Sequence, residues 1–269
     1  FHNAQYDVGW LQQVGIKVEG EIVDTMIAAA LIDENRYSFS LNNLSRDYLG
    51  ELKAETDLKQ AAADHGVDPK AEMWKLPAEH VGYYAEQDAR LTLLLWQRFK
   101  QEIQLQSLTT VWEMESKLLP NLIKMRQRGV RVEVELAEKL RTKMRIQEKE
   151  LLLAIRKESG VDTDIWAARQ IAIAFDKLKI EYPRTQKTDE PSFTQNWLVN
   201  CPHKIAKLIV QAREVNKFHN TFLSSIMKYQ VNSRIHAEIN QLRSDSGGTV
   251  SGRLSMSNPN LQQGWIKTI

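Results

Sequence analysis

The chain has 269 residues, enough for one large domain or two ordinary ones. Hydrophobic residues make up 42% and charged residues 26%, as in ordinary globular proteins, and no apolar run is long enough to predict a membrane span. The single cysteine, Cys201, excludes an internal disulfide and fits a reducing, intracellular setting, and no Cys/His spacing predicts a zinc site.

Charge divides the chain into two unlike halves. Residues 1–120 hold 11 Lys+Arg against 19 Asp+Glu, whereas residues 121–269 hold 25 against 15. The first half is therefore acidic, with a net charge of −8, and the second is basic, with +10. A basic half suits a polyanionic partner, although lysines and arginines also solvate long helices.

Helices outnumber strands in the predicted structure of residues 1–105. Asn3 and Asp7 flank the start of a first helix that ends at Gly15, and residues 16–23 form a strand or a connection. Further helices are predicted at 26–32, 41–48 and 81–104, with an Ala-rich turn and breaks over 61–80. An α/β domain whose central strands lie before residue 1 would show this pattern.

Within the last of these helices, residues 83–96 have an amphipathic pattern. The leucines, Ala85 and Ala89 are expected on its buried stripe. Tyr84 and Asp88 are four residues apart and project from one face. A phenol beside a carboxylate suits metal-dependent phosphodiester hydrolysis. The alternative is a packed ring next to a charge that stabilises the helix dipole.

Longer helices are predicted for the middle of the chain, at residues 107–128, 133–158, 167–178, 193–199 and 203–229. Ser192 is expected to cap the fourth of them. On the last, Arg213, Lys217 and Thr221 recur at four-residue steps along one outer strip. Two cations and a hydroxyl suit consecutive phosphates, and a solvated helix face is the alternative.

The composition of the chain changes after residue 233. Residues 234–242 alternate in the manner of a strand. Residues 244–255 contain three glycines within six positions, which lets the backbone approach a ligand closely. Residues 257–263 are dense in amide side chains. Arg, Asn and Gln side chains are those that reach minor-groove acceptors of DNA.

Three separated stretches resemble the family A DNA polymerases, and the phage replicative type is the most similar. His2–Asp7 resembles the second motif of the proofreading exonuclease domain, and Tyr84–Asp88 resembles the third. Residues 251–263, with Ser251-Gly252-Arg253-Leu254-Ser255 and Asn258-Pro259-Asn260-Leu261-Gln262-Gln263, are similar to the segment that joins thumb to palm. The resemblance covers essentially the whole chain.

The resemblance implies a hydrolytic site in which four carboxylates hold two Mg²⁺ or Mn²⁺ ions. Asp7 and Asp88 would be catalytic metal ligands, and Tyr84 would orient the attacking water. Asn3 would contact the terminal nucleotide or support the site. The family's first motif, Asp-x-Glu, would lie before Phe1. The two-metal site is therefore expected to be incomplete in this chain.

The resemblance also implies a DNA-binding surface. Arg253, Asn260 and Gln262 would contact the minor groove near the primer terminus. Arg213, Lys217 and Thr221 would match the thumb helix that grips the duplex backbone. The implied partners are primer-template DNA and, for the parent polymerase, dNTP; no membrane is expected, and a processivity partner is not identified.

The predicted fold class is α/β, an N-terminally truncated RNase H-like exonuclease domain, followed by a mainly α-helical thumb. The predicted domains are a partial 3′-5′ exonuclease domain at 1–106, a helical DNA-binding region at 107–243, and the start of a truncated palm at 244–269. The last six residues depart from the family pattern. The expected setting is the cytoplasm of a bacterial or phage-infected cell.

The parent is thus expected to be a DNA-directed DNA polymerase with a 3′-5′ exonuclease, acting in DNA replication. Three alternatives stay open. One is an RNase D-like exoribonuclease, which shares the Tyr-x-x-x-Asp arrangement. A second is a DNA-binding piece without activity of its own, because the catalytic sites are incomplete. A third is a helical scaffold with no active site.

Overall fold

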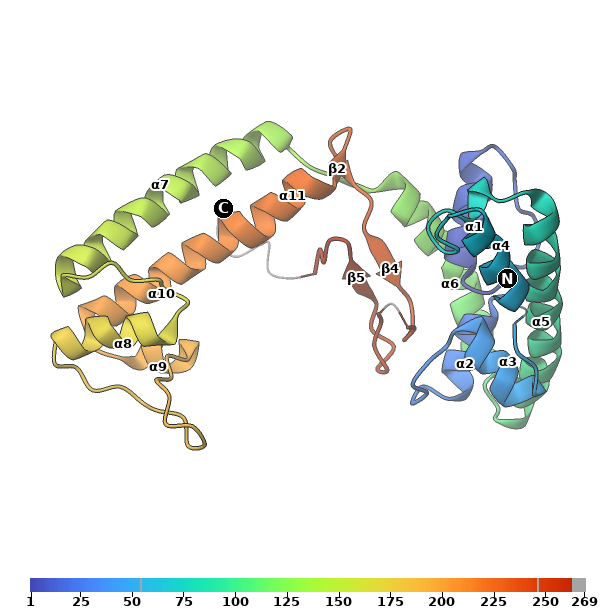
Figure 1. The fold of residues 1–269 in the computed structure, drawn as a ribbon, viewed down its shortest axis with the longest axis horizontal. Coiled ribbons are helices and arrows are strands. Elements are labelled where there is room, and N and C mark those ends of the chain that lie inside the picture. The colour runs from blue at the N-terminus through green and yellow to red at the C-terminus, as the bar shows by residue number, and fades with distance from the viewer. Residues whose placement is uncertain (54, 246, 263–269) are drawn as a thin grey trace. The chain divides into compact units, whose positions relative to one another are not determined.

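The computed structural model describes residues 1–53, 55–245 and 247–262, and helices dominate it (Figure 1). The chain forms two compact units. Unit 1 combines residues 1–129 with the described residues from His236 onward, and unit 2 contains residues 130–235. Packing thus divides the chain at 129 and 235, whereas the sequence predicts domain limits at 106 and 243. The last six residues, whose sequence departs from the family pattern, lie outside the described residues.

Unit 1 is a group of helices and one short β-ribbon. Its helices are α1 (Ala4–Gln13), α2 (Thr25–Ile32), α3 (Leu41–Leu49), α4 (Glu55–Asp64), the 3₁₀-helix η1 (Met73–Lys75), α5 (Ala78–Leu105) and α6 (Thr109–Arg128). The ribbon pairs β4 (Glu238–Asn240) with β5 (Ser255–Ser257) in antiparallel register. Within the described part of residues 1–129 no strand forms, and residues 16–23 are an irregular connection.

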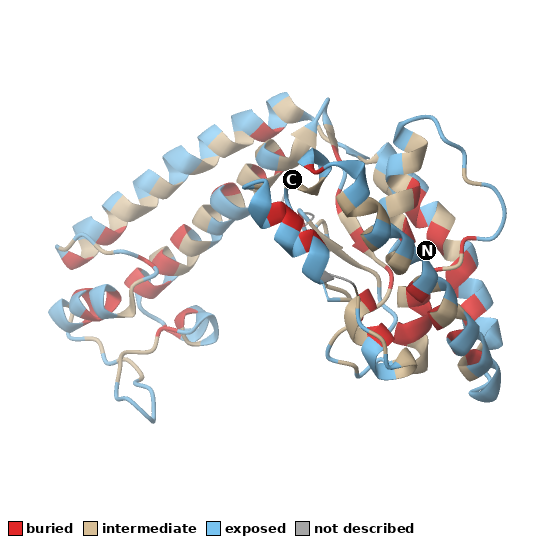
Figure 2. Cartoon of the chain, turned by 45° about the vertical axis from the view of Figure 1, so that its right-hand side comes forward, coloured by how far each residue is buried: buried red, intermediate tan, exposed pale blue. Residues whose placement is uncertain are grey.

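The core of unit 1 lies against one stripe of α5. Leu91, Leu95, Phe99 and Ile103 are buried at four-residue steps, and α2 and α3 pack on this stripe. Small side chains let α2 approach closely, since three consecutive alanines of its sequence are buried. Figure 2 shows the buried residues of the chain in red. The predicted helix is confirmed, but the expected places of Ala85, Ala89 and Leu93 are wrong. All three are exposed, because the buried stripe begins only at Leu91 and continues through Leu95.

The segment after His236 belongs to unit 1 because it is anchored on α6. The buried Gln241 amide donates to the Glu115 backbone carbonyl at 2.8 Å and to the Glu115 carboxylate. The turn that follows requires glycine at position 248. A Cβ there would lie 2.1 Å from the carbonyl oxygen of Leu242, and φ is +95°. Close backbone approach in this glycine-rich stretch is therefore observed within the chain itself.

Unit 2 is a long helical hairpin with a small helical end. Its elements are β1 (Val130–Arg131), α7 (Val134–Ser159), α8 (Ala168–Lys177), α9 (Gln195–Asn200), α10 (Lys204–Lys217), the π-helix η2 (Phe218–Leu223), α11 (Ser224–Tyr229), β2 (Gln230–Val231) and β3 (Arg234–Ile235). α7 packs antiparallel against the continuous rod of α10, η2 and α11 (Figure 1). The strands form an antiparallel sheet in the order β1-β3-β2. This sheet links the segment before α7 to the segment after α11.

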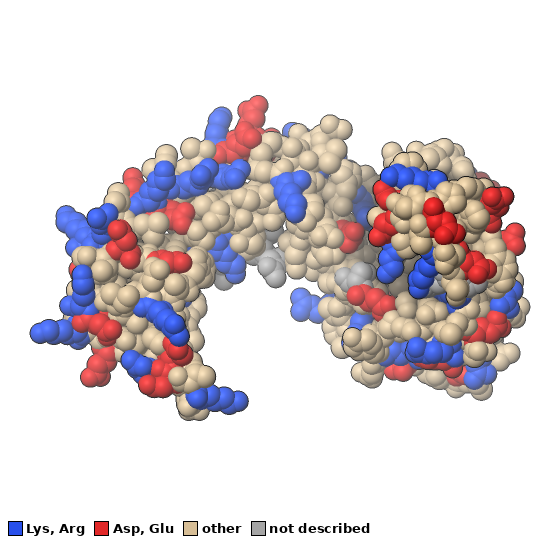
Figure 3. All heavy atoms as spheres, in the orientation of Figure 1, with Lys and Arg blue, Asp and Glu red and all other residues tan. Residues whose placement is uncertain are grey.

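Two kinds of packing hold unit 2 together. At one end, apolar side chains of α8, α9 and α10 form a core around Phe175, Leu198 and Ile205. Along the hairpin, α7 buries few residues, and Figure 3 shows Lys and Arg side chains spread along it. The predicted long charged helix at 133–158 is thus confirmed, as is the long helix at 203–229, although a π-helical turn interrupts the latter.

Two local predictions are wrong. Residues 55–64 form the helix α4, where a turn was expected to begin at 61. Ser192 does not cap α9. Its backbone N–H donates instead to the Pro183 carbonyl at 2.9 Å, and the hydroxyl of Thr194 accepts from the Trp197 N–H at 3.3 Å. The loop that pairs Arg184 with Pro191 holds Ser192 outside the helix.

Candidate active site

A pocket of about 840 Å³ in unit 1 brings together residues that are distant in the sequence. Asp7 reaches it from α1 and Asp88 from α5, 81 positions later. Asn3, Lys53 and Asp245 also line it. The structure therefore places the two carboxylates that the sequence singles out at one cavity, which local helix geometry alone does not require.

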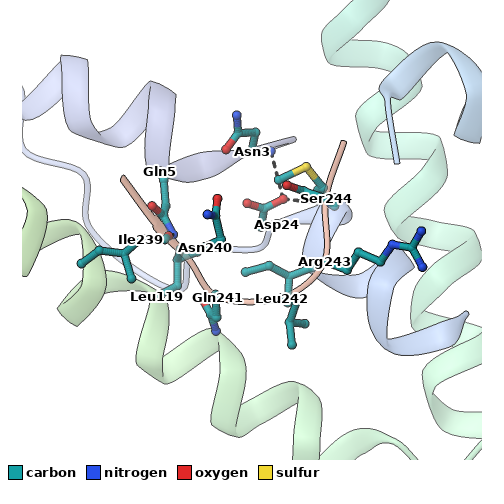
Figure 4. Close-up of a pocket in the computed structure, with 12 residues that line it drawn as sticks. Asn3, Gln5, Asp24, Leu119, Ile239, Asn240, Gln241, Leu242, Arg243 and Ser244 are labelled. Atoms are coloured by element: carbon teal, nitrogen blue, oxygen red, sulfur yellow. Dashed lines mark hydrogen bonds between the residues drawn. The ribbon is translucent and has the colours of Figure 1, made fainter. Parts of the chain in front are cut away.

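Asp24 fixes the start of α1, and thereby the position of Asp7. Its carboxylate accepts from the backbone N–H of Asn3 at 3.0 Å (Figure 4). It also accepts from the backbone N–H of Ala4 at 2.7 Å. It also caps α2 by accepting from the Met26 N–H at 2.9 Å. Asn3 has a left-handed backbone, with φ of 67°, and its side chain makes no cap of its own. One buried carboxylate thus joins the beginnings of two helices.

Tyr84 and Asp88 lie one turn apart on α5, as the sequence predicts, and Lys53 contacts both. The Lys53 ammonium is 2.7 Å from Asp88 Oδ2 and donates a hydrogen bond to Tyr84 Oη. It also lies 4.4 Å from the centre of the Tyr84 ring. Burial opposes the charge of Lys53, but the hydrogen bonds to Asp88 and Tyr84 outweigh it and raise the pKa of the ammonium.

Burial also shifts the pKa values of Asp7 and His2, which lie at the beginning of the chain in and next to α1. It raises the pKa of the Asp7 carboxyl above its ordinary value, although the nearby N-terminal ammonium acts in the opposite direction. Burial likewise lowers the pKa of the His2 imidazole, and the charge of Asp24 opposes this only in part. The pocket is therefore an environment that disfavours unpaired charge, and a cation would favour the ionised Asp7.

The residues of this pocket supply some of the ligands that a divalent-cation site needs. Among the described residues, no three His, Cys, Asp or Glu side chains lie close enough together to hold a metal ion. Asp7 and Asp88 nevertheless line one pocket, and Asp88 Oδ1 is buried without a hydrogen-bond partner. Hard divalent cations prefer carboxylate oxygens, so this oxygen is suited to such an ion. Asp7 and Asp88 are thus consistent with two of the several ligands that such an ion needs.

The predicted DNA-contacting residues of the last segment are exposed. Arg253, Asn260 and Gln262 all lie at the surface of unit 1. Gln262 is partly committed to the loop itself, because its side-chain amide donates to the Leu254 carbonyl at 2.8 Å. The Asn260 carboxamide accepts from the Gln262 N–H at 2.9 Å. The two amides thus organise the loop on which Arg253 is carried.

The strip on α10 is less regular than the sequence suggests. Lys217 and Thr221 are exposed, whereas Arg213 is half-buried. The Arg213 guanidinium donates to the carbonyls of Ile165 at 2.7 Å and Phe193 at 3.0 Å. Thr221 lies in the π-helix, whose wider turn changes the spacing assumed for a regular helix. Arg213 therefore has a role within unit 2 that its sequence spacing does not indicate.

Lys53 is a site residue that the sequence pattern did not identify, whereas Asp24-Thr25 was predicted to begin a helix without being given a role in the site. Asp24 had a detectable signal, because Asp-Thr before an apolar run is typical of a helix N-cap. Lys53 had none, since it follows α3 in an irregular segment and meets Asp88 only in the folded chain. Its backbone N–H donates to the Asn42 side chain at 3.1 Å, which ties this segment to α3.

Two family descriptions match the chain. Residues 1–104 match a family described as 3′-5′ exonuclease, and residues 134–268 match DNA polymerase family A. The chain belongs to DNA polymerase family A. The resemblance carried by residues 2–7, 84–88 and 251–263 is thereby confirmed. So is the predicted fold class of an exonuclease domain followed by a mainly helical region.

Relatives among characterised proteins support the same assignment. The DNA-directed DNA polymerase of Pseudomonas phage M6 is 38% identical, over 97% of this chain and 41% of that protein. DNA polymerase DpoZ of Salmonella phage PMBT28 is 30% identical, over 97% of this chain and 46% of that protein. The chain therefore spans less than half the length of these relatives.

A solved structure shares the fold. The POL domain of Pol1 from M. smegmatis, in complex with DNA primer-template and dNTP, has 22% sequence identity and a TM-score of 0.77. The likeness covers 99% of this chain and 42% of that one. An RNase D-like exoribonuclease would not need a polymerase region. Because residues 134–268 match DNA polymerase family A, that alternative is not supported.

Within the described residues, no helix combines the length and the apolar character needed to cross a membrane.

Proposed function

We propose that the whole protein copies DNA from a template and proofreads it with a 3′-5′ exonuclease, in the cytoplasm of a bacterial or phage-infected cell. Primer-template DNA and dNTP are its partners. This chain supplies part of the hydrolytic site, through Asp7, Tyr84 and Asp88, and part of the duplex-binding surface. Membership of polymerase family A and the exonuclease match over 1–104 support the assignment.

The observation that carries the hydrolytic part is the convergence of Asp7 and Asp88 on one pocket. In the proposed reaction, bound Mg²⁺ or Mn²⁺ supplies Lewis acidity and lowers the pKa of water. Asp7 and Asp88 hold the cations through their carboxylate oxygens. Tyr84 carries its hydroxyl on the same face of α5 as Asp88, so it can orient a water molecule by hydrogen bonding. Asn3, exposed at the pocket rim, contacts the terminal nucleotide.

An exposed aromatic pair on α1 suits the strand that enters this pocket. Tyr6 and Trp10 are 61% and 60% exposed, and their ring centres are 6.4 Å apart. Both line a shallow hollow of about 600 Å³ together with Asp7. Exposed aromatic rings stack on bases without regard to sequence. We assign them the single-stranded 3′ end next to the hydrolytic carboxylates.

The polymerase part of the proposal concerns exposed polar residues. Arg253, Asn260 and Gln262 contact minor-groove acceptors, which occur on every correct base pair. Lys217 and Thr221 contact the phosphate backbone. Arg213, whose guanidinium donates to two backbone carbonyls of unit 2, adds its positive charge to the same strip. The net charge of +10 over residues 121–269 favours such a partner.

The test of the hydrolytic site is the Asp88→Ala variant of the whole protein, assayed for trimming of a labelled 3′ end. Removing one of the ligands is expected to lower the rate at least 100-fold, whereas primer extension is retained. Glu86→Ala is the matched control, because Glu86 is an exposed carboxylate on the same helix that does not line the pocket. Unchanged trimming by Asp88→Ala would reject the proposed site.

A DNA-binding piece without activity is the second candidate for the isolated chain. It is favoured by the absence, among the described residues, of three metal-ligating side chains close together. Two carboxylates hold Mg²⁺ weakly. Incubating the 269-residue chain with labelled DNA and Mn²⁺ distinguishes the two, since rapid trimming from the 3′ end would exclude the binding-only candidate.

A further inference from the structure

One cation of the chain is placed where both proposed catalytic groups of α5 meet. Lys53 is buried apart from 12% of its side chain, and its ammonium contacts Asp88 Oδ2 at 2.7 Å. The same ammonium donates to Tyr84 Oη and lies over the face of the Tyr84 ring. An ammonium has three protons to donate, and two are used on these neighbouring groups.

The Asp88 carboxylate is divided between two environments. Oδ2 is engaged by Lys53, whereas Oδ1 is buried without a hydrogen-bond partner. Leaving a buried carboxylate oxygen unpaired is costly, so a partner at Oδ1 would stabilise the site. Because Lys53 occupies only one oxygen, the other is available as a ligand for a second cation. A pocket of about 840 Å³ that also contains Asp7 has room for it.

The position of Lys53 is set by the fold rather than by its own flexibility. Its backbone N–H is held by the Asn42 side chain at 3.1 Å, and α3 packs on α5. Only 12% of the Lys53 side chain is exposed, so most of it is enclosed by the fold. An ordinary surface ion pair would contribute little and would leave both side chains mobile.

We propose that Lys53 is a positioning residue of the hydrolytic site. It holds Tyr84 Oη and Asp88 Oδ2 in one arrangement and leaves Asp88 Oδ1 for a divalent cation. This inference rests on the proposed function. It also has an electrostatic consequence, because a fixed positive charge next to a cation site weakens cation binding. Lys53 thus orients the water-aligning phenol at the expense of metal affinity.

The substitution Lys53→Met separates these two effects. It keeps the length of the stem over the Tyr84 ring and removes the charge and the hydrogen bonds. Mn²⁺ binding to the 269-residue chain is measured by electron paramagnetic resonance, and the part lost on Asp88→Ala defines the site. Lys53→Met is expected to tighten this Asp88-dependent binding about tenfold. Equal affinity in both proteins, or no Asp88-dependent binding in Lys53→Met, would overturn the proposal.

The second arm measures 3′ trimming by the whole protein at saturating Mn²⁺. Lys53→Met is expected to lower kcat about tenfold or more with KM for DNA unchanged, and Lys53→Arg to recover part of the loss. Tighter metal binding with slower turnover is a combination that a merely structural lysine does not give. An unchanged kcat, or a loss seen only as unfolding by circular dichroism with no recovery in Lys53→Arg, would overturn the proposal.

Lys75→Met is the matched control. Lys75 also pairs with a carboxylate, Glu72, and lies 5.4 Å from the centre of the Trp74 ring, but it does not line the pocket. Its substitution is expected to change neither Mn²⁺ binding nor trimming. The proposed function fails separately. If the whole protein trims DNA but Asp88→Ala trims equally well, the site itself is wrong, whereas loss of trimming in Asp88→Ala with normal Lys53→Met rejects only the role of Lys53.

Discussion

Asp7 is a carboxylate whose charge the folded chain disfavours. Burial raises its pKa above the ordinary 3.8, so ionised Asp7 opposes folding at any pH above the raised pKa. The effect disappears below the ordinary pKa, where the group is protonated in both states. Asp7→Asn is therefore expected to raise Tm at pH 7 without divalent metal by roughly 1–3 °C. The gain should vanish as the pH falls below 3.8 in calorimetry.

Asp47 serves as a control, because its pKa is shifted in the opposite direction from that of Asp7. Hydrogen bonds from Arg46 and then Arg36 lower the pKa of its carboxyl. Its ionised form therefore favours folding above the ordinary pKa, and this contribution is lost as the pH falls through the lowered value. Asp47→Asn should lower Tm at pH 7. A fall in Tm for Asp7→Asn under the same conditions would contradict the burial of Asp7.

Arg213 is expected to act within unit 2 more than on DNA. Burial lowers the pKa of its guanidinium, but two backbone carbonyls accept its hydrogen bonds and the Trp166 ring lies 5.2 Å away. Arg213→Ala leaves the Ile165 and Phe193 carbonyls without these donors. We expect it to reduce the free energy of unfolding by about 2 kcal/mol, measured by urea titration.

Lys217 lies on the same helix as Arg213 and allows the effect of phosphate contact to be measured without an effect on stability. It is exposed, so Lys217→Ala should leave the urea midpoint unchanged. If it contacts a phosphate, the slope of log K against log salt for duplex DNA should decrease by about one. A larger decrease of this slope for Arg213→Ala than for Lys217→Ala would show that the guanidinium also leaves its carbonyls to bind DNA.

At this scale the sequence pattern identified groups that lie on one helix face or in a family motif. Asp7, Tyr84 and Asp88 are of this kind, and the pocket brings Asp7 and Asp88 together. Lys53 could not be predicted, since it lies 35 positions before Asp88 and its contact depends on how α3 packs on α5. A spacing rule contains no such long-range information.

Among the elements, the π-helix η2 has the most unusual interior. His219 in η2 is buried, and its Nε2 lies 2.6 Å from the Glu148 carboxylate of α7. Asn216 donates to the other oxygen of Glu148 at 2.6 Å and accepts from Trp166 Nε1 at 3.2 Å. The wider π turn thus coincides with a polar link across the helical hairpin.

His219→Ala is expected to destabilise unit 2 by about 3 kcal/mol, because it leaves Glu148 largely buried without one partner. The measurement is thermal and urea unfolding followed by far-UV circular dichroism. The double variant His219→Leu/Glu148→Leu should recover most of the loss, since replacing both partners removes the unpaired charge. A double variant as unstable as His219→Ala would point to packing as the cause.

Helix existence was predictable from periodicity, but helix detail was not. The buried face of residues 203–229 continues through the π turn, but with His219 and Leu223 rather than the predicted Phe222 as its buried residues. The four-residue spacing of Arg213, Lys217 and Thr221 on the outer face is disturbed by the π turn, because Thr221 lies within it. The cap at Ser192 was misplaced because tertiary hydrogen bonding in the preceding loop competes with capping.

For the whole molecule, the order of the chain and the order of packing differ. Gln241 returns to Glu115 of α6 across 126 positions, which places the last described segment in unit 1. Composition indicated two modules through the change in charge. It could not indicate that the chain leaves the first module and comes back, because such a return depends on contacts between residues far apart in the sequence, such as Gln241 with Glu115.

This arrangement allows the two proposed activities to be separated by substitution. Arg253 is exposed on a loop organised by Gln262 and Asn260, and it does not line the pocket that contains Asp88. Arg253→Ala in the whole protein should lower the rate of primer extension about tenfold or more, since a well-placed contact to a base edge is worth about 1–3 kcal/mol. Its trimming of a single-stranded 3′ end should stay within about twofold of the unsubstituted protein. Asp88→Ala should show the reverse, and unchanged extension by Arg253→Ala would exclude the minor-groove contact.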